Sequence, residues 1–87
     1  MQRTKPQIVA QHLKMLGRIT DATARAAYGS FRLADAIYRL RHDPKAQRLL
    51  PKGHTIITVP RVDVMGNPFA EYRLVPAAQA ERSRAHA

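Results

Sequence analysis

The sequence predicts a single α+β domain, in which helices come first and a β-hairpin follows. Two observations predict it. Up to residue 50 the apolar residues recur three or four positions apart, whereas from residue 54 they are β-branched and extended. A chain of 87 residues makes one domain with a small core. It contains no cysteine, so neither disulfides nor thiolate zinc sites support that core.

The first helix is expected over Lys5–Leu16. Pro6 suits the first helical turn, an apolar stripe follows at helical spacing, and Gly17 is a natural C-cap. Arg18 and Ile19 are then expected to form a brief extended link in which Ile19 is buried.

Two further helices follow, with a glycine between them. Thr20 is a good N-cap for a helix over Asp21–Tyr28, whose four alanines favour tight packing against another helix. Gly29 ends this helix, and Ser30 is expected to cap a third helix that runs to about Arg41. The apolar side chains of this third helix are expected to face inward. They are Leu33, Ile37 and Leu40.

The rest of the chain predicts a short helix and then two strands. Asp43 as N-cap and Pro44 at the first helical position predict a helix over Pro44–Leu50. "HTIITVPRVDV" and "FAEYRLV" are typical of strands, joined by the turn "MGNP". Pro60 lacks an amide donor, so its strand is expected at an edge of the sheet. The expected boundaries are a flexible lead-in over residues 1–4, the domain over residues 5–76 and a disordered tail over residues 77–87.

The charge of the chain is strongly positive. Fifteen Lys and Arg against six Asp and Glu leave a formal net charge of +9. This excess attracts polyanions over a screening length of about 8 Å at physiological salt, so nucleic acid, anionic membranes and acidic proteins are candidate partners. No apolar run is long enough to span a bilayer, and no helix joins a broad apolar face to a solidly basic one. We therefore expect a soluble intracellular protein with no membrane partner.

A short helix, a glycine-centred turn and an amphipathic helix make the helix-turn-helix pattern. With its apolar stripe inward, the third helix turns Arg32, Asp35 and Arg39 outward, where such a helix enters the DNA major groove. An arginine fork on guanine contributes about 1–3 kcal/mol of discrimination, and Arg39 and Arg41, further along, suit phosphates. The backbone N–H groups at the start of the second helix are expected to hold a phosphate. The predicted DNA-binding residues are Thr20, Thr23, Arg25, Ser30, Phe31, Arg32, Asp35, Arg39, Arg61 and Asn67.

Three helices followed by a β-hairpin are the order of a winged helix-turn-helix, with the hairpin as the wing. The stretch over residues 7–41, with residues 53–75 after it, resembles the small winged helix-turn-helix proteins encoded by phages and prophages. The shared elements are the "IT" entry to the second helix, the "YG" turn, the "FRLA" and "LR" of the third helix and the "YRL" of the closing strand. The resemblance covers about four-fifths of the chain. It implies a regulator of transcription that binds double-stranded DNA in the cytoplasm of a bacterial host cell, at the nucleoid.

One departure from that pattern is the stretch "DPKAQRLLPK" between the third helix and the wing, in which Lys45, Arg48 and Lys52 are expected to widen the basic face. Two alternative functions stay open. One is an excisionase-like architectural factor that bends DNA, and the other is a phage-encoded module that binds a host protein. A homodimer on a two-fold symmetric site is expected, because one small unit binds DNA weakly.

Several residues also have a simpler interpretation. Phe31 and Tyr38 are interpreted as packing residues rather than base contacts. Arg61 equally suits a role in protecting an edge strand from aggregation. The four histidines are scattered, and we expect them at the surface or at helix caps. The carboxylates do not cluster, the serines lack an elbow motif and no glycine-rich phosphate loop is present, so we expect neither an enzyme, nor a metal, nor a cofactor.

Overall fold

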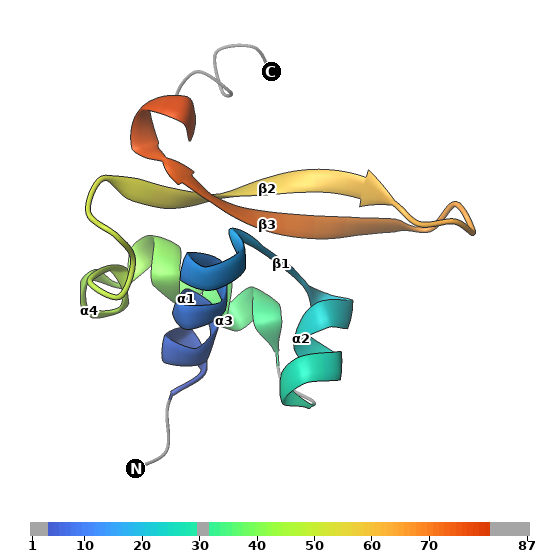
Figure 1. Cartoon of the computed structure of the whole chain (residues 1–87), viewed down its shortest axis with the longest axis horizontal. Coiled ribbons are helices and arrows are strands. Elements are labelled where there is room, and N and C mark those ends of the chain that lie inside the picture. The colour runs from blue at the N-terminus through green and yellow to red at the C-terminus, as the bar shows by residue number, and fades with distance from the viewer. Residues whose placement is uncertain (1–3, 30–31, 81–87) are drawn as a thin grey trace.

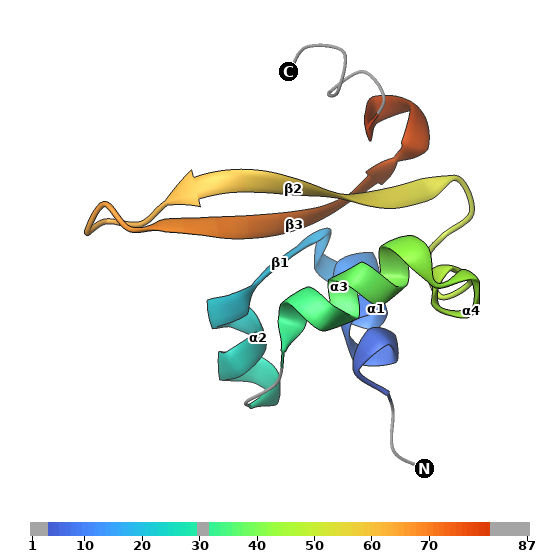
Figure 2. The same cartoon turned by 180° about the vertical axis from the view of Figure 1, so that it is seen from behind.

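The computed structural model describes residues 4–29 and 32–80, and these form an α+β arrangement of helices with a three-stranded antiparallel sheet (Figure 1). In chain order the elements are α1 (Lys5–Leu16), β1 (Arg18–Thr20), α2 (Asp21–Tyr28), α3 (Leu33–His42), α4 (Pro44–Gln47), β2 (His54–Val62) and β3 (Pro68–Pro76), followed by a helical turn over residues 77–80. The helices α1 to α4 lie on one side of the sheet, and the β2–β3 hairpin extends beyond them on the side of α2 (Figures 1 and 2).

Local caps set the ends of the first two helices where the sequence predicts them. At the start of α1 the backbone N–H of Gln7 donates to Thr4 Oγ1 at 3.3 Å, and the backbone N–H of Thr4 donates to Gln7 Oε1 at 2.9 Å. Gly17, at φ +81°, ends α1 in the left-handed conformation that favours glycine. Thr20 Oγ1 accepts the backbone N–H of Thr23 at 3.1 Å and so caps α2.

The extended link predicted after Gly17 is present, and it also pairs with another strand to become part of the sheet. Strand β1 pairs with β3, Ile19 lies opposite Tyr72, and the strand order is β1-β3-β2. The sheet therefore has three strands, where the sequence predicts a two-stranded hairpin. Ile19 is buried as expected. A three-residue strand is too short to show a period, and its partner lies some fifty residues away along the chain, so the pattern alone does not reveal it.

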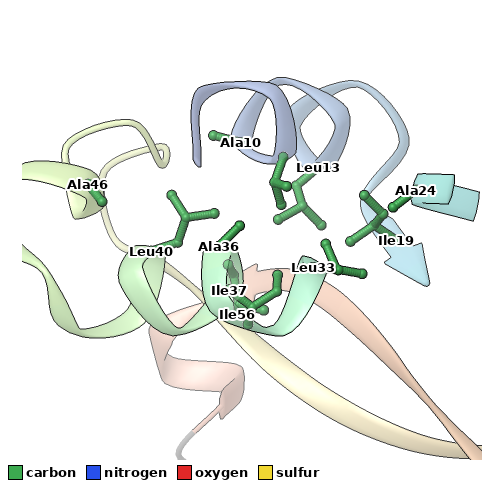
Figure 3. Packing of buried hydrophobic residues seen from close by; sticks show 11 residues of the cluster. Ala10, Leu13, Ile19, Ala24, Leu33, Ala36, Ile37, Leu40, Ala46 and Ile56 are labelled. Atoms are coloured by element: carbon green, nitrogen blue, oxygen red, sulfur yellow. The ribbon is translucent and has the colours of Figure 1, made fainter. Parts of the chain in front are cut away.

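The core gathers between α1, α3 and the sheet (Figure 3). The predicted inward stripe of α3 is confirmed, since Leu33, Ile37 and Leu40 are at most 2% exposed. The other members of the core cluster come from each of the helices α1 to α4 and from two strands. They are Val9, Ala10, Leu13, Ile19, Ala24, Ala36, Ala46 and Ile56. Helix α3 is thus fixed by one face only, and its opposite face is left to solvent.

Helix α2 packs less closely than the sequence predicts. Of its four alanines only Ala24 is buried, while Ala22, Ala26 and Ala27 are exposed. The expectation that the whole alanine-rich segment is packed is therefore wrong. The helix lies at one end of the helical layer and turns a single stripe toward the core, so most of its small side chains meet solvent (Figure 1).

Two helix boundaries also differ from the prediction. Helix α3 begins at Leu33 with Arg32 at its N-cap, and the expected cap, Ser30, lies outside the described residues. Helix α4 ends at Gln47 instead of Leu50. It ends early because the backbone N–H groups of the next two leucines donate to carbonyls three residues back instead of four, which tightens the chain into a turn.

The tail predicted to be disordered from residue 77 begins with a helical turn. Residues 77–80 are helical, and Ala80 is only 4% exposed. The backbone N–H of Ala77 donates to the carbonyl oxygen of Gly53 at 2.8 Å, which attaches this turn to the start of the hairpin. A single buried alanine gives no visible period in the sequence, which is why the turn is not predicted.

His12 is buried, although the scattered positions of the histidines predict that each lies at the surface or at a cap. It is 6% exposed, its Nδ1 lies 2.6 Å from the hydroxyl of Tyr28, and the two rings meet edge to face. Its Nε2 is buried and has no hydrogen-bond partner among the described residues. The contact attaches the end of α2 to α1 and so helps to position the turn that leads into α3.

Arg41 connects α3 to the hairpin instead of facing a phosphate as predicted. Its Nε donates to the carbonyl oxygen of Ile56 at 3.1 Å, and its Nη2 donates to Thr58 Oγ1 at 2.5 Å. Its guanidinium carbon also lies 5.8 Å from the centre of the Tyr72 ring. Arg41 therefore sets how the hairpin sits relative to α3.

We expect Arg41→Ala to lower the free energy of unfolding by about 1–3 kcal/mol, because the carbonyl oxygen of Ile56, a buried residue, loses its donor. Arg41→Lys should restore only part of this loss, since an ammonium lacks the planar fork of the guanidinium. Urea unfolding followed by circular dichroism measures both. Arg48→Ala, at an exposed position, is the control and should change stability by less than about 0.5 kcal/mol. An equally small loss for Arg41→Ala would show that this connection does not stabilise the fold.

Candidate nucleic-acid interface

The outer face of α3 carries charged and aromatic side chains. Asp35, Tyr38, Arg39 and His42 are all exposed, and their spacing places them along one side of the helix, opposite the buried stripe. Arg39 Nε lies 3.5 Å from Asp35 Oδ2, and both side chains are 58% exposed. A surface pair of this kind contributes only about 0.3–0.5 kcal/mol. The guanidinium of Arg39 can therefore exchange this carboxylate for another anion at little cost.

Tyr38 is exposed, so its interpretation as a packing residue is wrong. It is 63% exposed, and its ring centre lies 4.6 Å from that of His42. Position 38 falls between Ile37 and Arg39 and off the buried stripe, so the helical spacing alone indicates that it points outward. The face of α3 thus combines a cation with an aromatic pair.

Arg32 lies at the entrance to α3. It is exposed at the N-cap position, and no side chain of a described residue caps the helix there. Two of the predicted contacts, Ser30 and Phe31, lie outside the described residues. Of the residues predicted around the turn, Arg32 is therefore the one that the structure places next to the outer face of α3.

The start of α2 is a weaker anion site than the sequence predicts. The backbone N–H of Thr23 already donates to Thr20 Oγ1, and the two hydroxyl oxygens lie 2.9 Å apart. Arg25 Nη2 lies 2.8 Å from Asp21 Oδ2 in an exposed pair one helical turn apart. The carboxylate of Asp21 therefore partly neutralises the charge of Arg25 at the place where the predicted phosphate would lie. The spacing of Asp21 and Arg25 is a known signal for such a pair and is visible in the sequence.

The tip of the hairpin, near the predicted contacts Arg61 and Asn67, exposes mainly apolar side chains. Residues 62–68 contain no Lys or Arg, whereas Val64 is 101% and Met65 is 81% exposed. The backbone N–H of Asn67 donates to Asp63 Oδ1 at 2.9 Å, and its side chain also hydrogen-bonds that carboxylate, so its amide group serves the turn. Arg61, exposed on β2 opposite Phe69, remains as the cation nearest the tip.

A hollow of about 670 Å³ lies between the hairpin, α2 and the start of α3. It brings together Thr20, Arg25 and Arg61, which the sequence predicts as contacts from distant parts of the chain. The full lining is Thr20, Asp21, Ala22, Arg25, Leu33, Ala34, Arg61, Asp63, Phe69, Ala70, Glu71 and Tyr72. Asp35 and Arg39 do not line it and lie instead on the outer face of α3, so these two groups of predicted residues are not brought together.

Two carboxylates help to hold the hairpin. The backbone N–H of Asn67 is the main cause that lowers the pKa of Asp63, and the N–H groups of Met65 and Gly66 add to it. A hydrogen bond from Arg73 is the main cause that lowers the pKa of Glu71, and the charges of Arg61 and Arg18 act in the same direction. Both carboxylates are therefore stabilised in their ionised form by contacts that exist only in the folded chain.

This arrangement predicts loss of stability in acid. Because the folded-state pKa lies below the ordinary value, each carboxylate stabilises the fold above that value, which is 4.5 for Glu71 and 3.8 for Asp63. The contribution is lost as the pH falls from these values through the lower folded-state pKa. We expect the urea midpoint to fall between about pH 5 and about pH 3, and Asp63→Asn with Glu71→Gln to flatten that fall. An unchanged pH profile in the double variant would contradict these roles.

The positive charge belongs to the helical part of the chain. Among the described residues, those up to residue 53 include ten Lys and Arg against three Asp, whereas residues 54–80 include two cations and two carboxylates. The net positive charge of the described residues therefore lies in the helical part of the chain, and the hairpin adds no net charge to it. A polyanion would be attracted mainly to the helical layer.

In the residues that the structure describes, His, Asp and Glu side chains nowhere gather in threes as metal ligands would. Over the same residues, every helix is too short or too polar to cross a membrane. Comparisons of the chain with protein-family models, with curated proteins and with solved structures find no match.

Proposed function

We propose that this chain is a winged helix-turn-helix domain that binds double-stranded DNA as a regulator of transcription, with α3 as its recognition helix. The observation that carries the proposal is the outer face of α3. It presents Arg32, Tyr38 and Arg39 to solvent, while the opposite side of the same helix is fixed in the core. A helix held in this way can enter a groove without rearranging the domain.

The connection between the helices supports this proposal. Four residues, 29–32, join α2 to α3, and Gly29 at φ +83° stands at the first of them. The ten residues of α3 span about 15 Å, against a major groove about 12 Å wide. The helix is therefore long enough to cross the groove and reach the phosphates beside it.

The roles within the face follow from chemistry. Arg32, at the entrance of the helix, can bind guanine O6 and N7 through its planar fork. Arg39, two turns further along, is placed for a phosphate once it releases Asp35. The exposed ring of Tyr38 offers an apolar surface to a thymine methyl group.

Selection of bound sequences from a random DNA pool, followed by fluorescence anisotropy on the selected duplex at increasing salt, tests the proposal. We expect a linear fall of log affinity with log salt, with a slope of about −0.9 per phosphate contacted. A two-fold symmetric motif would agree with a homodimeric regulator, whereas strong bending of adjacent sites would favour the excisionase-like alternative. Failure to bind any duplex at low salt would contradict DNA binding.

A protein-binding module is the second candidate, and the hairpin tip favours it. Val62, Val64 and Met65 are 67–101% exposed, and exposed apolar patches commonly mark protein contacts. The test is capture of a stoichiometric protein partner by a variant in which Arg32 and Arg39 are alanine, since that variant keeps the tip unchanged. Loss of capture on Val64→Ser with Met65→Ser would assign the contact to the tip.

A further inference from the structure

We infer that the segment Asp43–Lys52, which contains α4, is a second DNA contact that binds the phosphodiester backbone beside the groove occupied by α3. The inference rests on the proposed function and gives a role to a segment that the helix-turn-helix and the hairpin do not require. Its partner is the phosphate backbone of the same duplex, recognised by charge and not by base sequence.

The segment is firmly attached to the end of α3. The backbone N–H of Asp43 donates to the carbonyl oxygen of Arg39 at 2.8 Å, and the side-chain amide of Gln47 donates to the carbonyl oxygen of Arg41. Ala46 is buried in the core cluster. Leu49 and Leu50 pack against the same cluster, so both ends of the segment are held. Its backbone therefore keeps a constant position relative to α3, which reduces the backbone entropy lost on binding.

The segment presents three cations and no available anion. Lys45, Arg48 and Lys52 are exposed, and none of them forms an ion pair with a described residue. Asp43 is its single carboxylate, and Asp43 Oδ1 already accepts the backbone N–H of Lys45 at 3.0 Å as the helix cap. The surface is therefore complementary to a polyanion, and the charge is not neutralised within the segment.

The position of α4 agrees with a backbone contact. Helices α2 and α4 lie toward opposite ends of α3, with α4 at its C-terminal end (Figures 1 and 2). Since α3 is about 15 Å long and the major groove is about 12 Å wide, a helix that places its N-terminal half on base edges brings its C-terminal end to the phosphates that border the groove. Helix α4 and the loop after it follow directly from that end of α3, and they carry Lys45, Arg48 and Lys52.

The test replaces Lys45, Arg48 and Lys52 by alanine together and repeats the salt titration on the duplex that the unmodified protein selects. We expect the log–log slope to become less steep by about 0.9 for each phosphate that the variant no longer neutralises, or roughly 2–3 in all. The ranking of duplexes with single base changes should stay the same, because phosphate contacts carry no sequence information. A variant with Lys45 and Lys52 as arginine should keep the original slope.

Arg18→Ala is the matched control, because Arg18 is an exposed cation on β1. Its neighbour Ile19 faces the helices, and successive side chains of a strand point to opposite faces, so Arg18 lies on the other side of the sheet. This variant should leave the slope within about 0.3 of the original. An unchanged slope in the folded triple variant would overturn the inference while leaving the proposed function in place, and so would an altered base preference. If the unmodified protein binds no duplex, the proposed function fails first.

Discussion

Leu40→Ala should lower the free energy of unfolding by about 3–5 kcal/mol, which is the cost of a cavity in a well-packed core. Leu40 is 0% exposed and lies in the cluster that joins α3 to α1 and α4 (Figure 3). A domain of this size has a total stability of roughly 4–13 kcal/mol, so this one side chain contributes a large share of it. Urea unfolding measured by circular dichroism gives the difference directly.

Tyr38→Ala is the matched control for this measurement. It also removes a large side chain from α3, but from the exposed face, so we expect a loss below about 1 kcal/mol. Similar losses for the two variants, or a loss below about 1 kcal/mol for Leu40→Ala, would show that α3 is not held by its inward stripe. The orientation of the proposed recognition face would then have no basis.

Arg32→Ala should weaken binding to the selected duplex by roughly 5- to 150-fold, corresponding to about 1–3 kcal/mol for a guanine contact through the guanidinium fork. The loss should be confined to duplexes that keep the contacted guanine, so the variant should tolerate other bases at that position. Arg32 is exposed and caps no helix with its side chain, so the fold should remain intact. Anisotropy with a panel of single-base variants of the duplex measures both effects.

Arg39→Ala separates the two kinds of contact. Because Arg39 is proposed to contact a phosphate, its removal should weaken all duplexes alike and make the salt slope less steep by about 0.9. Arg18→Ala, on the far side of the sheet, should change neither quantity. If the Arg32→Ala and Arg39→Ala variants bind as tightly as the Arg18→Ala variant and the unmodified protein, the assignment of α3 as the recognition helix is contradicted.

Features set by neighbouring residues could be predicted from the sequence. The capping residues Thr20 and Gly17, the helical spacing that buries Leu40 and the β-branched run of β2 each act over a few positions, and all of them appear where expected. Helices α2 and α3 are present for the same reason. The exposed position of Tyr38 also follows from the helical spacing, which outweighs the general tendency of aromatic residues to be buried in a small domain.

Features that depend on distant partners could not be predicted. The pairing of β1 with β3, the bonds from Arg41 to β2 and the contact of His12 with Tyr28 join residues at least 15 positions apart. No local pattern specifies such a partner. The prediction that Arg41 contacts a phosphate fails for the same reason. Its position on α3 suits a phosphate, and only the placement of the hairpin shows that it meets acceptors on β2 instead.

The most direct test of the central claim is a map of backbone amide chemical shifts as the selected duplex is added to the full chain. The account predicts the largest changes along the exposed side of α3, at Arg32, Asp35, Tyr38, Arg39 and His42, with the buried stripe much less affected. Changes confined to the hairpin tip or to the far side of the sheet, with the exposed side of α3 unmoved, would contradict it.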